Sequence, residues 1–146
     1  MLSIEEIRKL IEVAQLYRLN AFVPLTDHPI GASVLATNGE YFGGCNTESY
    51  ISGLGTCAER SAVDHAVSHG KYEFKAIAIV DDVLTYPCGA CLQYLVFYSQ
   101  IIETDIDIVV ADIQGKYLLK TLNELLPNGY RTHQNLEKLK SYRNKP

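Results

Sequence analysis

The sequence lacks several features that mark other classes of protein. It contains no tryptophan, one methionine and only four cysteines among 146 residues. No run of about 18 apolar residues occurs that could cross a membrane as a helix. The first ten residues, MLSIEEIRKL, lack the basic region and apolar core of a secretory signal. We therefore expect a cytoplasmic protein with no membrane partner.

Positive charge is scarce as well. Lys and Arg total 13 against 17 Asp and Glu, a formal net charge of −4, which argues against a nucleic-acid-binding surface. Hydrophobic residues make up 47% of the chain and charged residues 21%, a balance that suits one packed core. Because no repeat or long linker interrupts the sequence, we predict a single domain over residues 1–146, with 131–146 as a basic C-terminal helix or tail.

The hydrophobic pattern predicts alternating helices and strands. A capping-box pair, Ser3 and Glu6, marks the first helix start, and Asn38-Gly39 is typical of a tight hairpin turn. The predicted elements are a helix to about Asn20, strands at 32–37 and 41–45, a helix at 57–69, a strand at 76–80, a helix after Pro87, and strands at 106–112 and 117–121. This order predicts an α/β fold, a three-layer α/β/α sandwich with a five-stranded mixed sheet.

Three of the four cysteines stand where a predicted helix begins. Cys57 precedes the second helix, and Cys88 and Cys91 begin the third. The Cys88-Gly-Ala-Cys91 spacing lets one helical turn present two sulfurs to a tetrahedral metal ion, to which Cys57 would add a third. In a reducing compartment such cysteines indicate metal or redox chemistry rather than disulfides. Three ligands leave zinc a fourth position for water, whose pKa the metal lowers.

The charged neighbours of Cys57 suit such a site. Glu59 would take a proton from the water and pass it on, as a general acid/base. Arg60 would offset the negative charge of three thiolates by donating a hydrogen bond to a ligand sulfur. Without the cysteines, Glu59 would be an ordinary carboxylate in the first turn of a helix, and Arg60 a surface arginine.

The motifs Cys57-Ala58-Glu59 and Pro87-Cys88-Gly89-Ala90-Cys91 together resemble the signature of the zinc-dependent cytidine deaminases, in the form with three cysteine ligands. The resemblance extends to HPIGASV (28–34), GGCNTES (43–49) and ELLPNGY (124–130). It implies one zinc ion per subunit, and hydrolytic deamination of cytidine or deoxycytidine to the uridine product and ammonia in pyrimidine salvage. It also implies a homotetramer, with a homodimer as the alternative.

The resemblance assigns substrate contacts too. It implies that Asn46 and Glu48 bind the ribose, although both could simply form a polar turn. The backbone amide of Ala58 and the carbonyl of Tyr86 would hold the pyrimidine edge and the leaving amino group. Tyr130 would pack on the base in a neighbouring subunit's site, unless it is an ordinary core or interface tyrosine.

The chain departs from the family pattern at three places. His28 stands where a phenylalanine commonly stacks on the base, Ser52-Gly53 replaces an aromatic-proline pair, and Leu92 replaces an arginine that commonly follows the second cysteine pair. Arg60 would therefore neutralise the thiolates more nearly alone. A histidine near this glycine block also occurs in blasticidin-S deaminases, which provide the alternative substrate.

The residues alone also allow other classes of site. Cys88 and Cys91 could form a thioredoxin-like redox dithiol at a helix N-terminus. Cys45 could complete a four-cysteine structural zinc site in a non-catalytic module, although a strand cysteine is usually a buried apolar residue. His65 and His69, four residues apart on a helix, are a weaker candidate for a metal pair than for a solvated helix face.

Overall fold

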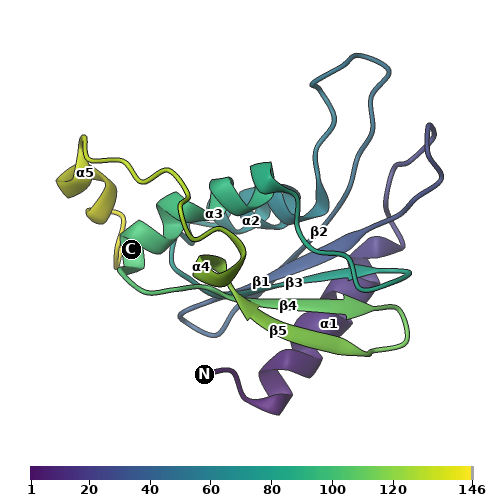
Figure 1. The fold of residues 1–146 in the computed structure, drawn as a ribbon, viewed down its shortest axis with the longest axis horizontal. Helices are drawn as coiled ribbons and strands as arrows, with labels where there is room; N and C mark the ends of the chain where they lie inside the picture. Colours follow the sequence, from purple (N-terminus) through teal and green to yellow (C-terminus); the bar gives the residue numbers. More distant parts are fainter. Residues whose placement is uncertain (146) are drawn as a thin grey trace.

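A five-stranded mixed sheet forms the centre of the molecule in the computed structural model, which describes residues 1–145 (Figure 1). The strand order is β2-β1-β3-β4-β5, and only the β3–β4 pair is parallel. The elements are α1 (Ile4–Arg18), β1 (Gly31–Ala36), β2 (Tyr41–Cys45), α2 (Ala58–Ser68), β3 (Phe74–Asp81), α3 (Gly89–Ile102), β4 (Asp107–Asp112), β5 (Tyr117–Thr121), α4 (Leu122–Leu125) and α5 (Leu136–Lys140).

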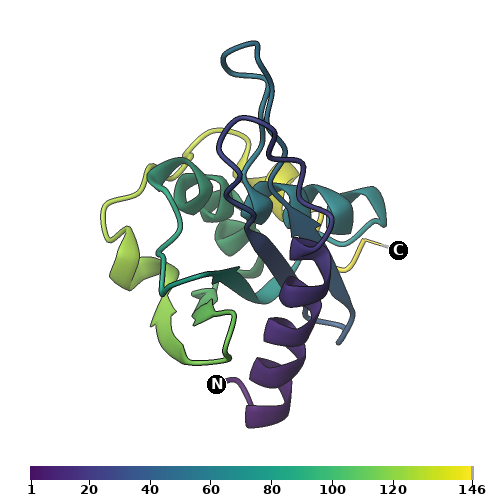
Figure 2. The same ribbon diagram turned by 90° about the vertical axis from the view of Figure 1, so that its right-hand side faces the viewer.

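Helices cover both faces of this sheet. Helix α1 lies on one face, and α2 and α3 lie on the other (Figures 1 and 2). The central strand β3 serves both cores, because successive side chains point to opposite faces: Ala78 packs with α1, whereas Ile77 and Ile79 pack with α2 and α3. The predicted three-layer α/β/α sandwich with a five-stranded mixed sheet is confirmed.

The local signals in the sequence act where they were expected. Ser3 and Glu6 form a reciprocal capping box at the start of α1, and Gly39 adopts φ +92° in the turn between the antiparallel strands β1 and β2. The differences lie at the ends of elements and near the C-terminus. Helix α1 ends at Arg18 rather than near Asn20, and β3 is longer at both ends than predicted.

The C-terminal segment is less helical than its composition suggested. Of the predicted basic stretch 131–146, only the short α5 is helical, and Pro146 lies outside the described residues. Lys140 and Arg143 both pair with Glu103 at the end of α3. These positive charges therefore hold the segment against α3 rather than form a free basic surface.

Two glycines let the helices approach the sheet closely. A Cβ atom at Gly31 would lie 2.0 Å from the backbone oxygen of Ala14 on α1, and one at Gly44 would lie 2.3 Å from the backbone nitrogen of Ala62 on α2. Any larger residue would push these helices outward. Gly44 thereby contributes to the placement of α2, whose first turn carries the Cys57 motif.

Candidate metal centre and substrate cleft

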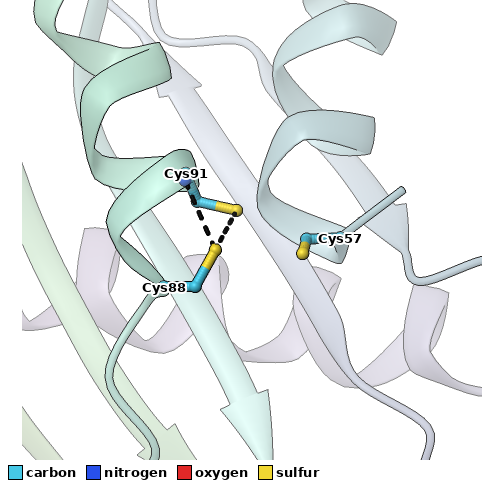
Figure 3. Close-up of side chains that lie close together, drawn as sticks. All are labelled: Cys57, Cys88 and Cys91. Carbon is cyan, nitrogen blue, oxygen red and sulfur yellow. Dashed lines mark hydrogen bonds between the residues drawn. The ribbon is translucent and has the colours of Figure 1, made fainter. Parts of the chain in front are cut away.

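The starts of α2 and α3 bring three cysteines together. Cys57 is the N-cap of α2, Cys88 is the N-cap of α3, and Cys91 lies in the first turn of α3. Their sulfur atoms all lie within 4.8 Å of one another and turn toward the space between the two helices (Figure 3). Because each helix N-terminus carries partial positive charge, the two ends favour thiolates here.

The electrostatics of this cluster fit a cation. Burial, followed by the negative charge of Glu59, raises the pKa of the Cys91 thiol well above its usual value. Burial also acts to raise the pKa of Cys88, but hydrogen bonds, including one of 3.4 Å from the Cys91 backbone N–H, lower it overall. Ionisation of the crowded sulfurs is therefore costly without a nearby cation, and three sulfur donors form a ligand set that suits zinc.

Arg60 supplies positive charge beside the sulfurs. Its Nη2 atom lies 3.6 Å from Cys57 Sγ, and hydrogen bonds to the Cys57 and Cys91 thiols raise the pKa of the guanidinium. The Arg60 Nε atom is buried and has no hydrogen-bond partner within residues 1–145. A partly buried guanidinium directed at cysteine sulfurs is the arrangement expected where those sulfurs are ionised, as metal ligands are.

Glu59 lies on the inner side of the same helix turn. Its side chain is buried, with the residue 6% exposed, and the Cys91 thiol donates to Glu59 Oε2 over 3.4 Å. Burial raises the pKa of this carboxyl group. A raised pKa brings a carboxyl group closer to the range in which a general acid/base works.

A cleft of about 500 Å³ opens next to the cysteines. It gathers most of the predicted site residues: Asn46, Glu48, Cys57, Ala58, Glu59, Arg60, Tyr86 and Cys88 line it, while Cys91 is buried behind them. Ala58 is the first residue of α2, so its backbone N–H has no partner inside the helix and is free to bind a ligand. The cysteine cluster and a cleft that contains several polar groups therefore lie side by side.

Two loops, residues 19–30 between α1 and β1 and residues 46–57 between β2 and α2, line the cleft together with the metal-site residues. Residues 22 and 47 pair as an isolated bridge, and residue 47 pairs in turn with residue 56. Both loops project from the same end of the molecule (Figures 1 and 2). The Asn46 side chain accepts from the Ile30 backbone N–H at 2.8 Å and donates to the His28 carbonyl at 3.0 Å. Asn46 therefore links the loop that follows β2 to the segment that precedes β1.

Two predicted contacts lie elsewhere. His28 does not line the cleft; its Nε2 atom lies 2.9 Å from Oδ1 of Asp81, a buried carboxylate at the end of β3. Tyr130 is 65% exposed and also lies outside this cleft. The sequence pattern did not single out Asp81, although an acidic residue that closes the apolar run AIAIV was a usable signal.

Tyr130 is held by its backbone rather than by its ring. Gln93 on α3 donates to the Tyr130 carbonyl at 2.7 Å and accepts from the Tyr130 N–H at 2.8 Å. Two turns later, Gln100 makes the same pair of bonds to Thr132. These two amide side chains align the 130–132 segment with α3 and leave the tyrosine ring exposed.

Comparison with known proteins agrees with this geometry. Residues 4–108 match the family model described as the cytidine and deoxycytidylate deaminase zinc-binding region. The chain belongs to this deaminase family. A cytidine deaminase of Sporosarcina psychrophila is 34% identical over 127 residues, which cover 86% of this chain and 91% of that protein.

Further relatives of this deaminase include a blasticidin-S deaminase of Bacillus cereus, 29% identical over 132 residues that cover 84% of this chain and 90% of that protein. A crystal structure of a cytidine deaminase from Burkholderia pseudomallei has a TM-score of 0.78 and 32% identity, and the match covers 84% of this chain and 98% of that one. The deaminase family and its fold are thus shown by both sequence and structure.

Cys45, the fourth cysteine of this deaminase, lies apart from the other three. Within residues 1–145, the cluster of possible metal-binding sulfurs comprises Cys57, Cys88 and Cys91, and Cys45 at the end of β2 is not part of it. The structure thus gives no support to a four-cysteine site. The described residues contain no helix with the length and apolar character that crossing a bilayer requires.

Proposed function

We propose that this protein is a zinc-dependent hydrolase that converts cytidine or deoxycytidine to the uridine product and ammonia. The observation that carries the proposal is the shared cleft: Cys57 and Cys88 of the three-cysteine cluster, the buried Glu59 and two polar loop residues border one space of about 500 Å³. A cytosine would lie beside the sulfurs, and the attached sugar would extend toward the loops.

Cys57, Cys88 and Cys91 would hold one zinc ion per subunit. When bound, zinc acts as a Lewis acid that lowers the pKa of a coordinated water molecule. Arg60 donates to Cys57 Sγ over 3.6 Å and, with the helix N-termini, offsets the negative charge of three thiolates. The fit of sulfur donors, spacing and nearby positive charge supports this assignment.

Glu59 would carry the protons of the reaction. It accepts a proton from the attacking water as the oxygen bonds to C4 of the cytosine, and it delivers that proton to N3. It then moves the second proton of the water to the amino group, so the C4–N bond breaks and ammonia leaves. The water is consumed, and the glutamate returns to its starting state.

The backbone would orient the base. The free N–H of Ala58 at the start of α2 would donate to the pyrimidine edge, and the Tyr86 carbonyl would accept from the amino group that leaves. Both residues line the cleft. Asn46 and Glu48 would bind the sugar, and a site that hydrogen-bonds hydroxyl groups disfavours analogues without them.

We also propose that the chain assembles as a homotetramer in which Tyr130 reaches a neighbouring site. Three observations support this proposal: the Tyr130 ring is exposed, its backbone is held by Gln93, and Tyr130 does not line the cleft of its own chain. Reduced cysteines as metal ligands suit a reducing compartment, so we propose pyrimidine salvage in the cytoplasm as the role.

A second candidate substrate is blasticidin S. The 29% identical relative from Bacillus cereus and the histidine at position 28 favour it, whereas relatives named cytidine deaminase match at higher identity. An ultraviolet assay across cytidine, deoxycytidine, cytosine and blasticidin S, with zinc measured on the same sample, tests both. We expect cytidine and deoxycytidine to be converted with one zinc per chain; inactivity on every substrate would contradict the proposal.

A further inference from the structure

Thr26 connects two of the predicted substrate residues. Its hydroxyl donates to Glu48 Oε2 at 2.7 Å and accepts from the His28 backbone N–H at 3.2 Å. The backbone N–H groups of Leu25 and Thr26 donate to the other carboxylate oxygen, at 2.9 and 3.2 Å. Glu48 is therefore held in place by a short piece of the neighbouring loop.

The conformation of this loop depends on a tight turn. The Asp27 N–H donates to the Val23 carbonyl at 2.9 Å, and Asp27 adopts φ +55°, in the left-handed region that aspartate tolerates. The segment is also joined to the next loop, because the Phe22 carbonyl accepts from the Glu48 N–H at 2.8 Å. The turn thus directs two consecutive N–H groups and the Thr26 hydroxyl at one carboxylate.

Glu48 retains one free acceptor position after its hydrogen bonds to the loop. An ionised carboxylate offers about four acceptor positions, and three of them are used here by the loop. One acceptor position remains, on Oε2. The hydrogen bond from Thr26, followed by those from the backbone, lowers the pKa of Glu48, so the group is an ionised acceptor at neutral pH.

Asn46 retains complementary groups. Its side chain uses one N–H and one acceptor position on the 28–30 segment, which leaves one N–H and one acceptor position. A hydroxyl that donates to Glu48 Oε2 and accepts from the Asn46 amide would satisfy both residues. Such a pair of groups matches the donor and acceptor of one sugar hydroxyl in kind, and its contact with that hydroxyl would depend on the direction of the Glu48 carboxylate.

We propose that Thr26 is a positioning residue, whose hydroxyl orients the Glu48 carboxylate toward one hydroxyl of the substrate's sugar. The inference rests on the proposed function, because it requires a nucleoside in the cleft. Thr26 acts through Glu48 and need not touch the substrate. Its removal should therefore change substrate binding rather than the chemical step.

The test is a double-mutant cycle on cytidine. Thr26→Val removes the hydroxyl and keeps the shape, Thr26→Ser keeps the hydroxyl, and Glu48→Ala removes the group that Thr26 orients. Thr104→Val, at an exposed threonine that lies outside the cleft, is the matched control. Zinc content and melting temperature are measured for every variant, together with kcat and KM.

We expect Thr26→Val to raise KM up to about tenfold with kcat within roughly twofold, because a Glu48 carboxylate without the Thr26 hydroxyl would lose part of its charge-assisted hydrogen bond to the sugar. In the Glu48→Ala background the same change should alter KM by less than about twofold. Thr26→Ser and Thr104→Val should resemble the unmodified chain. Equal effects of Thr26→Val in the two backgrounds, or a Thr26→Ser variant as weak as Thr26→Val, would overturn the inference.

The outcome for the unmodified chain separates the two proposals. If that chain converts cytidine while Thr26→Val leaves KM unchanged, only the positioning role is wrong. If that chain converts neither cytidine nor deoxycytidine, the proposed function is wrong, and the positioning role falls with it.

Discussion

The two ends of the cleft are built from different kinds of structure. The metal end rests on the first turns of α2 and α3, where Cys57, Cys88 and Cys91 follow directly from local sequence. The sugar end rests on loops, where Asn46 and Glu48 take their positions from hydrogen bonds to residues 25–30. Helix starts hold groups at well-defined places, whereas loops tolerate substitution. We infer that the chemistry is fixed by the helices and the choice of substrate by the loops.

The largest effect should come from the metal end. Glu59→Gln keeps the shape of the side chain but cannot shuttle a proton, so kcat should fall by roughly a thousandfold or more. Zinc content and melting temperature should stay close to those of the unmodified chain. The ultraviolet deamination assay, paired with metal analysis, checks both.

Glu5→Gln provides the matched control for Glu59. Glu5 is also a glutamate in the first turn of a helix, but it is exposed on α1. If Glu59 were only an N-terminal helix carboxylate, the two variants would behave alike. Comparable activity of both variants would remove Glu59 from the mechanism.

Arg60→Ala should have the next largest effect. It removes the guanidinium beside Cys57, and loss of such a partner of a metal ligand typically costs about 10- to 100-fold in metal affinity or activity. The exposed Arg8 on α1 serves as a control, and Arg8→Ala should leave both properties unchanged. Zinc affinity is measured by competition with a chelator, alongside kcat. If Arg60→Ala matched the unmodified chain in both properties, as Arg8→Ala should, the role of Arg60 would be contradicted.

The difference between helix starts and loops also explains which features could be predicted from the sequence. The cysteine spacing, the capping box and the Asn38-Gly39 turn are local signals, and the structure places each of these residues where the pattern indicated. The five-stranded sheet followed from the order of apolar segments. Local chemistry over a few residues was sufficient in each case.

Contacts between distant segments could not be predicted this way. The His28–Asp81 pair joins residues 53 apart in the chain, and the Thr26–Glu48 bond joins residues 22 apart. The close approach of α2 to Gly44 likewise depends on the packed sheet. Such contacts exist only after the layers assemble, because no local pattern encodes which loop will lie beside which.

A smaller effect is expected when the hydrogen bonds that position Tyr130 are removed. Gln93→Leu removes both hydrogen bonds to the Tyr130 backbone, so KM for cytidine should rise about three- to tenfold with kcat nearly unchanged, as expected for the loss of one or two neutral hydrogen bonds. Gln100→Leu, which removes the equivalent bonds to Thr132, is the matched control and should alter KM less. Equal shifts in KM for the Gln93 and Gln100 variants would indicate a general weakening of the 130–132 segment rather than a specific role of Tyr130.

Mixed assemblies would show whether Tyr130 acts in a neighbouring site. Tyr130→Ala chains keep Glu59, and Glu59→Gln chains keep Tyr130. If the two residues meet across subunits, mixing the two inactive or weakened chains under exchange conditions should restore part of the activity. A mixture no more active than the sum of its parts would place Tyr130 outside the catalytic site.

The smallest effect is predicted for Cys45→Ser. Cys45 lies at the end of β2, where burial raises the pKa of its thiol, and its sulfur is not one of the three that cluster at the starts of α2 and α3. Zinc content and kcat should therefore stay within about twofold of the unmodified chain, whereas Cys57→Ser should lose most of the zinc. Metal analysis of both variants is decisive: if Cys45→Ser lost zinc while Cys57→Ser kept it, the metal would not be held by the helix starts, and the contrast between a helix-built chemical end and a loop-built sugar end would fail.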